Sequence, residues 1–307
     1  MIDEPSDRTI VLHLLRGAVP ERADEISSLW TKYAPAVEVA PSAVGTTMNA
    51  NRHRVRFDTK TIDLFWLLGF STWRSIEVYS PALVITMLLG LTIDQALHID
   101  EKITTFERDY KERMEAAASL ISATSTDDIA WPPDVPRPQA DRDSFPDSQD
   151  KVAFDLTALA IAFALLHEFS HVKLLAEKVQ PDTLPEEELA CDVWARDFMT
   201  AKLAAYARAH GHTFEEVSQK RAMALALAAT VVRAITPTSA QWGNSEYPPL
   251  SDRIQAIVAS FNLPSDSSFW FFAACLLVGI MRQEHRPLDI IGRTPQALAE
   301  ALIARMR

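Results

Sequence analysis

The spacing of apolar and polar positions predicts one helix after another from residue 151 onward. Val152–Lys178 contains neither glycine nor proline and is apolar on nearly every side as far as His167, which is typical of a buried central helix. The sequence TLPE at 183–186 has the form of a capping box with proline in the first turn, and predicts the start of another helix. A second capping signal, TFEE at 213–216, precedes the apolar stretch Ala222–Ile235.

The first 121 residues have a more mixed pattern. Asn51–Lys60, NRHRVRFDTK, alternates polar and apolar residues as a half-exposed strand does. An apolar section follows, and Ile93–Leu120 is charged and rich in helix-favouring residues. The pattern as a whole predicts a mostly α (α+β) protein. An N-terminal α+β region with a small sheet, residues 1–121, would precede a helical region over residues 151–307.

Residues 122–150 separate these two regions and differ from both in composition. The segment SATSTDDIAWPPDVPRPQADRDSFPDSQD is rich in Pro, Asp and Ser, which disfavours regular structure and indicates a long loop or linker. Its apolar WPPDVPRP part favours docking against the rest of the protein. Long ordered loops are often functional, but a plain linker has the same composition.

Apolar runs raise the question of a membrane span. Each run is shorter than the ~18–20 residues that a helix needs to cross a bilayer, so buried core helices explain them better. The runs are Thr61–Phe70, Pro81–Leu91, Val152–Leu166 and Phe269–Met281.

Charge and cysteine content narrow the class of protein. The formal net charge of −11 disfavours binding to a nucleic-acid backbone, which calls for a basic face. Two cysteines among 307 residues give no disulfide framework and suit a reducing compartment. The acidic start MIDEPSDRTI lacks the pattern of a secretory signal. We therefore expect a cytoplasmic protein with no membrane or nucleic-acid partner.

The sequence HEFSH, residues 167–171, places two histidines and a glutamate inside an apolar helix. His167 and His171 are separated by four residues, so their rings project from one face and can share one cation. This is the H-E-x-x-H pattern of zinc peptidases. Zinc activates water at such sites, and Glu168 would act as the general base that passes the proton to the leaving amine. The alternative is a pair of histidines that make ordinary hydrogen bonds in the core.

Catalytic zinc usually has three protein ligands, so a third ligand is needed. The metzincin extension fails because Leu174 and Glu177 occupy the positions of its glycine and its third histidine. A glutamate from the following helix is the other option. We favour Glu188, because Asp192 lies one turn further on and could accept a hydrogen bond from a ligand histidine. Glu187 shares its helical stripe with Ala190, Trp194 and Phe198, which indicates a core face.

The combination of HEFSH with EEELACDVWARDFM, which contains Glu188 and Asp192, resembles the H-E-x-x-H…E-x-x-x-D arrangement of gluzincins. Over about residues 152–200 it looks most like the Lit-type phage-exclusion peptidases. That resemblance implies a zincin-like helical core, bound Zn2+ and a cytoplasmic protein substrate. A translation factor is a candidate substrate by this resemblance only.

A later segment, YPPLSDRI at 247–254, resembles the H-P-x-x-x-x-R-I stretch of HtpX-like gluzincins, with tyrosine in place of histidine. Tyr247 is our candidate for a second donor to the oxyanion. The alternative for Tyr247 is a proline-stiffened turn with a partly buried ring. For Arg253 a structural ion pair is favoured over a direct catalytic role.

The remaining candidates are weaker. His210 and His212 flank a glycine just before a helix cap, which favours a solvated loop over a metal site. Cys191 has no paired base nearby in the sequence and is interpreted as a packing residue.

Three functions fit these features. The first is a zinc endopeptidase that cleaves a cytoplasmic protein, with a role in phage defence. The second is an ImmA-like regulatory peptidase that cleaves a repressor, although no helix-turn-helix signal supports an attached DNA-binding module. The third is a non-catalytic helical binding protein with an inert HEFSH.

Overall fold

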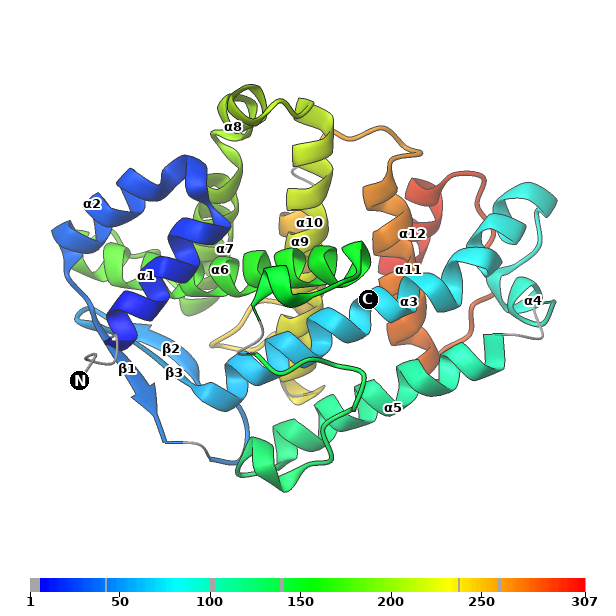
Figure 1. Cartoon of the computed structure of the whole chain (residues 1–307), viewed down its shortest axis with the longest axis horizontal. Helices are drawn as coiled ribbons and strands as arrows, with labels where there is room; N and C mark the ends of the chain where they lie inside the picture. The colour runs from blue at the N-terminus through cyan, green and yellow to red at the C-terminus, as the bar shows by residue number, and fades with distance from the viewer. Residues whose placement is uncertain are drawn as a thin grey trace.

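The computed structural model describes residues 6–41, 43–99, 103–138, 141–236, 238–258 and 261–306. Residues 1–5, the first half of the acidic start MIDEPSDRTI, lie outside these ranges, as do Gln139 and Ala140 of the predicted linker. The described part is mainly helical with one small sheet, so the predicted mostly α (α+β) fold is confirmed (Figure 1).

Among the described residues, the three strands follow one another between α2 and α3. The strands are β1 (Ala36–Ala40), β2 (Met48–Asn51) and β3 (Arg54–Asp58). The α-helices are α1 (Asp7–Ala18), α2 (Ala23–Tyr33), α3 (Thr59–Leu89), α4 (Ile93–Leu97), α5 (Ile103–Ser122), α6 (Ser148–Glu177), α7 (Leu184–Thr200), α8 (Leu203–His210), α9 (Phe214–Ile235), α10 (Leu250–Val258), α11 (Ser268–Gln283) and α12 (Pro295–Arg305). Short 3-10 helices are η1 (Pro20–Arg22), η2 (Thr126–Asp128), η3 (Arg142–Ser144) and η4 (Thr238–Ala240).

The sheet has the strand order β1-β3-β2, in which β1 is parallel to β3 and β2 is antiparallel to it. The strand predicted over Asn51–Lys60 is present as β3, but it covers only Arg54–Asp58, and Asn51 is the last residue of β2. At its start, Asn51 Oδ1 accepts hydrogen bonds from the backbone of His53 and Arg54 and closes a tight turn. At its end, Asp58 accepts from the Thr61 N–H and caps α3.

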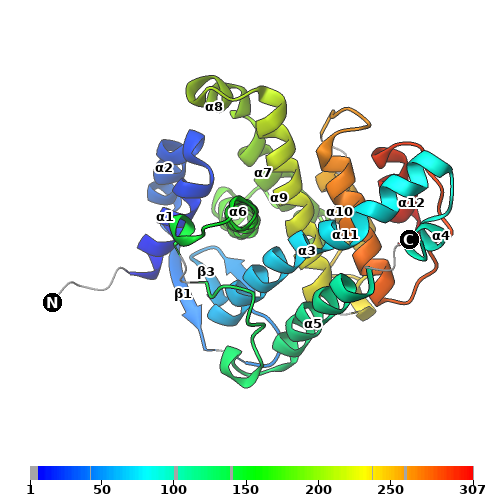
Figure 2. The same cartoon turned by 45° about the vertical axis from the view of Figure 1, so that its right-hand side comes forward.

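The predicted central helix is α6, and it runs through the middle of the molecule. Figure 2 views it nearly end-on, with α1 and α2 on one side, α7 and α9 on another and the sheet below. Gly69 lets α3 cross it closely, because a Cβ at that position would lie 1.9 Å from Thr157 Oγ1. The capping boxes predicted at Thr183 and Thr213 are both formed, and they begin α7 and α9.

Two expectations about the apolar runs are corrected. The run Val152–Leu166 continues as α6, which is long and apolar enough to cross a membrane by length and composition. In this structure 78% of its most apolar window is buried by the rest of the protein. Thr61–Phe70 and Pro81–Leu91 belong to one helix, α3, whose end exposes Leu88 and Leu89 instead of burying them.

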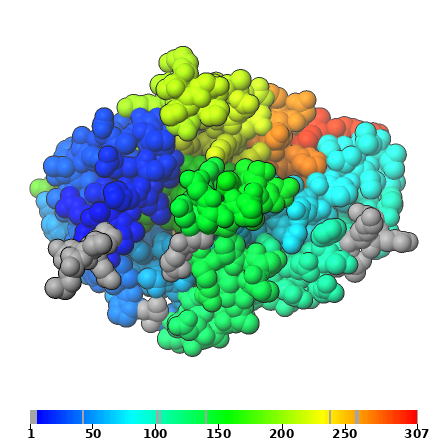
Figure 3. Space-filling view, viewed as in Figure 1, coloured from blue at the N-terminus to red at the C-terminus, as the bar shows by residue number. Residues whose placement is uncertain are grey.

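The described part of the 122–150 segment docks on the protein, as its apolar sequence indicated. Trp66 Nε1 of α3 donates to the Pro136 carbonyl at 2.6 Å, and Arg113 of α5 pairs with Asp134 at 2.5 Å. Arg142 pairs with Asp155 near the start of α6. Asp155 precedes His167 by about three turns of α6, so the Arg142 contact lies that far from the histidine along the helix. On the face shown in Figure 3, this green segment lies between the blue N-terminal helices and the cyan α3.

Most buried apolar side chains of the described residues form one connected core to which residues 1–121, 122–150 and 151–307 all contribute, and Leu203, Ala207 and Val217 form a separate small cluster. Leu15, Val135 and Leu225 are examples from the three stretches. The N-terminal helices are held onto the C-terminal half by a buried ion pair between Glu21 and Arg221 at 2.7 Å.

Candidate metal centre

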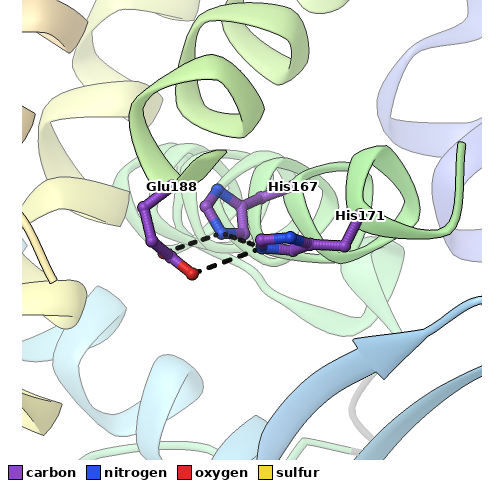
Figure 4. Close-up of side chains that lie close together, drawn as sticks. All are labelled: His167, His171 and Glu188. Carbon is purple, nitrogen blue, oxygen red and sulfur yellow. Dashed lines mark hydrogen bonds and ion pairs between the residues drawn. The ribbon is translucent and has the colours of Figure 1, made fainter. Parts of the chain in front are cut away.

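Helix α6 presents His167 and His171 on one side, one turn apart, as the motif spacing predicts. Their Nε2 atoms are 3.3 Å apart (Figure 4). The helix is fixed from its opposite side by aromatic packing. Phe169 stacks on Trp30 of α2 with a centroid distance of 4.8 Å and contacts Trp194 of α7 at 6.1 Å. This packing sets the rotation of α6 and therefore the direction in which both histidines point.

Helix α7 brings Glu188 to the same point. Its Oε2 atom is 3.3 Å from His167 Nε2, and its Oε1 atom is 3.4 Å from His171 Nε2. Ligand atoms of the three side chains all lie within 4.8 Å of one another. Among the described residues, this is the one group of three or more His, Cys, Asp or Glu side chains that converges in this way. The structure therefore brings together the three residues that the sequence analysis proposed as ligands.

Asp192 and Arg253 lie behind His167. Asp192 Oδ1 is 2.9 Å from His167 Nδ1. Arg253 of α10 donates to both oxygens of Asp192, at 2.6 and 2.8 Å, and its Nη1 atom lies 3.5 Å from Glu188 Oε2. Arg253 thus makes the ion pair that the sequence analysis favoured, and it joins α10 to the same cluster.

The interpretation of Glu187 as part of a core face is incomplete. Glu187 is buried, but its Oε1 atom lies 2.7 Å from His171 Nδ1. This contact was not predicted from the sequence, because Trp194 and Phe198 on the same stripe do pack in the core region. The available signal was the pair Glu187 and Glu188 at the start of a helix that already carries Asp192.

The electrostatics of the cluster favour positive charge at the histidines. Burial alone would lower the pKa of both rings, because a charged imidazole loses hydration there. The Asp192 carboxylate outweighs this effect and raises the pKa of His167. For His171 the nearby Cys191 thiol and the Glu188 carboxylate do the same. The site therefore stabilises positive charge, whether protons or a metal cation carry it.

The acidic residues of the cluster are held in their ionised form. Burial would raise the pKa of Glu188 and of Asp192, but the neighbouring cations reverse that shift. Hydrogen bonding to His167 and His171, and the charge of Arg253, hold the pKa of Glu188 below its usual range. His167 and Arg253 lower the pKa of Asp192. Both side chains are thus carboxylates at neutral pH.

The donor arrangement fits a zinc ion. Each neutral imidazole carries one N–H, and the carboxylates of Asp192 and Glu187 at the two Nδ1 atoms favour the proton there. Both Nε2 atoms then direct lone pairs at one another and at the Glu188 oxygens. Such a convergence of acceptors is repulsive unless a cation lies between them. Two imidazole nitrogens and one carboxylate match the ligand set of catalytic zinc.

Glu168 and Tyr247 lie within electrostatic reach of the cluster. Burial raises the pKa of Glu168, and the charges of His167 and His171 oppose that shift. Tyr247 is 43% exposed and lies in a turn where Asn244 Oδ1 accepts from its backbone N–H. Burial, and then the charge of Glu188, raises the Tyr247 pKa, and Glu168 contributes to the same shift. Tyr247 is therefore electrostatically coupled to Glu188 and Glu168.

The weaker candidates stay outside it. His210 and His212 are exposed, and their rings lie against Tyr206 at centroid distances of 4.4 and 6.4 Å. Cys191 is fully buried and unpaired with another cysteine, in keeping with a packing role, although its thiol lies beside His171.

Comparison with known proteins gives one match. A family model described as Peptidase U49 matches residues 55–273, from β3 into α11. The matched range contains both histidines, Glu188 and Arg253. No curated protein and no solved structure matches the chain significantly.

Proposed function

Because this chain belongs to the Peptidase U49 family of peptidases, we propose that it is a zinc-dependent endopeptidase of the gluzincin type that cleaves a cytoplasmic protein. One observation carries the proposal. His167, His171 and Glu188 direct their acceptor atoms to one point, while carboxylates face both Nδ1 atoms. With neutral imidazoles that carry their protons on Nδ1, only acceptor atoms meet at this point, which suits a metal cation.

The chain's own residues supply the proton transfers. His167, His171 and Glu188 would hold a zinc ion, which would supply Lewis acidity toward the scissile carbonyl and the attacking water. Glu168 accepts the proton of the attacking water and returns it to the leaving amine. Its raised pKa suits this role, because a base with a pKa closer to the working pH accepts a proton more readily.

The biological setting in the proposal rests on the resemblance of residues 152–200 to Lit-type phage-exclusion peptidases. On that basis we propose a role in phage defence and a folded cytoplasmic protein, such as a translation factor, as the substrate.

The proposal is tested by two measurements on the full-length protein. Purified protein should contain about one zinc ion per chain when measured by inductively coupled plasma mass spectrometry, and a His167→Ala variant should contain little zinc. Cells that express the parent should contain new protein N-termini that are absent from cells expressing Glu168→Gln. A parent protein without metal, or identical N-termini in both cultures, would contradict the proposal.

Tyr247→Phe is expected to lower turnover by ~100–1,000-fold while zinc stays bound, if its hydroxyl donates to the developing oxyanion. The reason is its position within reach of both Glu188 and Glu168. Cleavage rate and metal content should be measured on the same preparation. A Phe variant with parental cleavage would assign Tyr247 to the turn alone.

Asp192→Ala is expected to weaken zinc affinity by ~10–100-fold, because the His167 ring loses the group that orients it. The structure adds a cost in stability, since Arg253 would lose its two hydrogen bonds to Asp192 and keep only the 3.5 Å contact with Glu188; breaking a buried ion pair typically costs ~3–5 kcal/mol. The double variant Asp192→Ala/Arg253→Met should regain much of the stability in the presence of EDTA but not the affinity. Unchanged affinity in both variants would remove Asp192 from the metal site.

A further inference from the structure

Glu187 makes a contact that a structural role in α7 does not require. Its side chain is buried, with Oε1 at 2.7 Å from His171 Nδ1 and Oε2 at 3.5 Å from Gln180 Nε2. The acidic start of a helix is usually explained by the helix dipole. Here Glu186 already serves the helix end, because it closes the capping box with Thr183. Glu187 instead points toward the histidine.

A short carboxylate contact is also present at the other ring, at 2.9 Å, although only the His171 contact has hydrogen-bond geometry. Asp192 faces the Nδ1 atom of His167, and Glu187 faces the Nδ1 atom of His171. Both carboxylates come from α7, the helix that also carries Glu188. One helix therefore contributes the acidic ligand and a carboxylate for each histidine, so the position of α7 against α6 sets both ring orientations together.

We propose that Glu187 is a positioning residue, which holds the His171 ring with its proton on Nδ1 and its Nε2 lone pair directed at the metal. This inference rests on the proposed function, because it assigns Glu187 a role at the zinc site. A carboxylate in this position both fixes the tautomer and strengthens the imidazole as a ligand. Cys191 follows Glu187 by four residues and also lies beside His171, but a thiol is a weak acceptor and cannot replace the carboxylate.

The test compares zinc dissociation constants of the full chain, measured by competition with a chelating dye. Glu187→Ala should weaken zinc binding by ~10–100-fold. Glu187→Gln should retain most of the affinity, because its amide oxygen can still accept from Nδ1–H. Glu186→Ala is the matched control, since it removes an exposed carboxylate from the same turn and should leave the affinity near the parental value.

A second readout separates positioning from general stability. With cobalt in place of zinc, Glu187→Ala should shift the visible absorption bands of the bound metal, whereas Glu186→Ala should not. Thermal unfolding in EDTA reports the stability of the metal-free fold for each variant. If Glu187→Ala binds zinc as tightly as the parent and has the parental cobalt spectrum, Glu187 has no positioning role, and the proposed function stands. If the parent binds neither metal, both the proposed function and this inference are overturned.

Discussion

Glu168→Gln is expected to keep its zinc and to lose at least ~100-fold in turnover. The side chain is adjacent to His167 in the sequence but is not among the converging ligand atoms. Glutamine has nearly the same size, so the buried position should accept it with little change in stability. An amide cannot accept a proton from water at neutral pH, and the proposed mechanism then has no general base.

The measurement is cleavage of the substrate found from the new N-termini, together with metal content of the same sample. Glu177→Gln is a suitable control because it makes the same chemical change on the same helix at an exposed position. Glu177 pairs with Lys173 and Lys32 near the surface, and such pairs contribute little to stability. Parental activity in Glu168→Gln would show that the proton moves by another route. Equal losses of turnover in Glu168→Gln and Glu177→Gln would indicate that the substitutions disturb the structure of α6 and not the proton transfer.

The two histidines could be predicted because their relation depends on one helix alone. A spacing of four residues within α6 fixes the rings on one face whatever surrounds the helix. The starts of α7 and α9 were also predictable, since a capping box is closed by residues three positions apart. Glu188 could be proposed from the residues that share its stripe of α7, although its approach to α6 is a tertiary contact.

Contacts between distant segments could not be predicted from the pattern. Glu187 and Glu188 point in directions about 100° apart around the axis of α7. Both still reach the histidines, because the side of α7 that lies between these two directions faces α6. Arg253 is 61 residues from Asp192, so the sequence indicates an ion pair without naming the partner. The parallel pairing of β1 with β3 is likewise set by packing.

The sequence pattern also failed to predict the length of α3, because tertiary packing supports a helix that continues through a proline. Proline usually ends or bends a helix, and the sequence shows Thr61–Phe70 and Pro81–Leu91 as two separate apolar runs. In the structure α3 continues through Pro81, supported by α5, α6 and α11 along its length. The exposed Leu88 and Leu89 at its end show that an apolar run need not be buried throughout.

Glu188→Ala is expected to remove most of the bound zinc, and the activity with it. Glu188 is the ligand that α7 contributes, and only the two Nε2 atoms of α6 would remain to hold the ion. The loss in affinity should exceed the ~10–100-fold expected for the carboxylates behind the histidines, because a direct bond to the metal is removed. Glu187→Ala should lie between Glu188→Ala and the parent, so the order of the three dissociation constants tests the assignment of both glutamates.

Stability provides an independent measurement of the same change. A ligand that binds only the folded state raises the free energy of unfolding by about 2.7 kcal/mol at 100 times its dissociation constant. The parent should therefore melt at a higher temperature with zinc than with EDTA, and Glu188→Ala should lose most of that difference. Glu186→Ala, an exposed neighbour, should keep it. If Glu188→Ala retained the zinc-dependent rise while Glu187→Ala lost it, the two glutamates would have to exchange roles, with Glu187 as the third ligand.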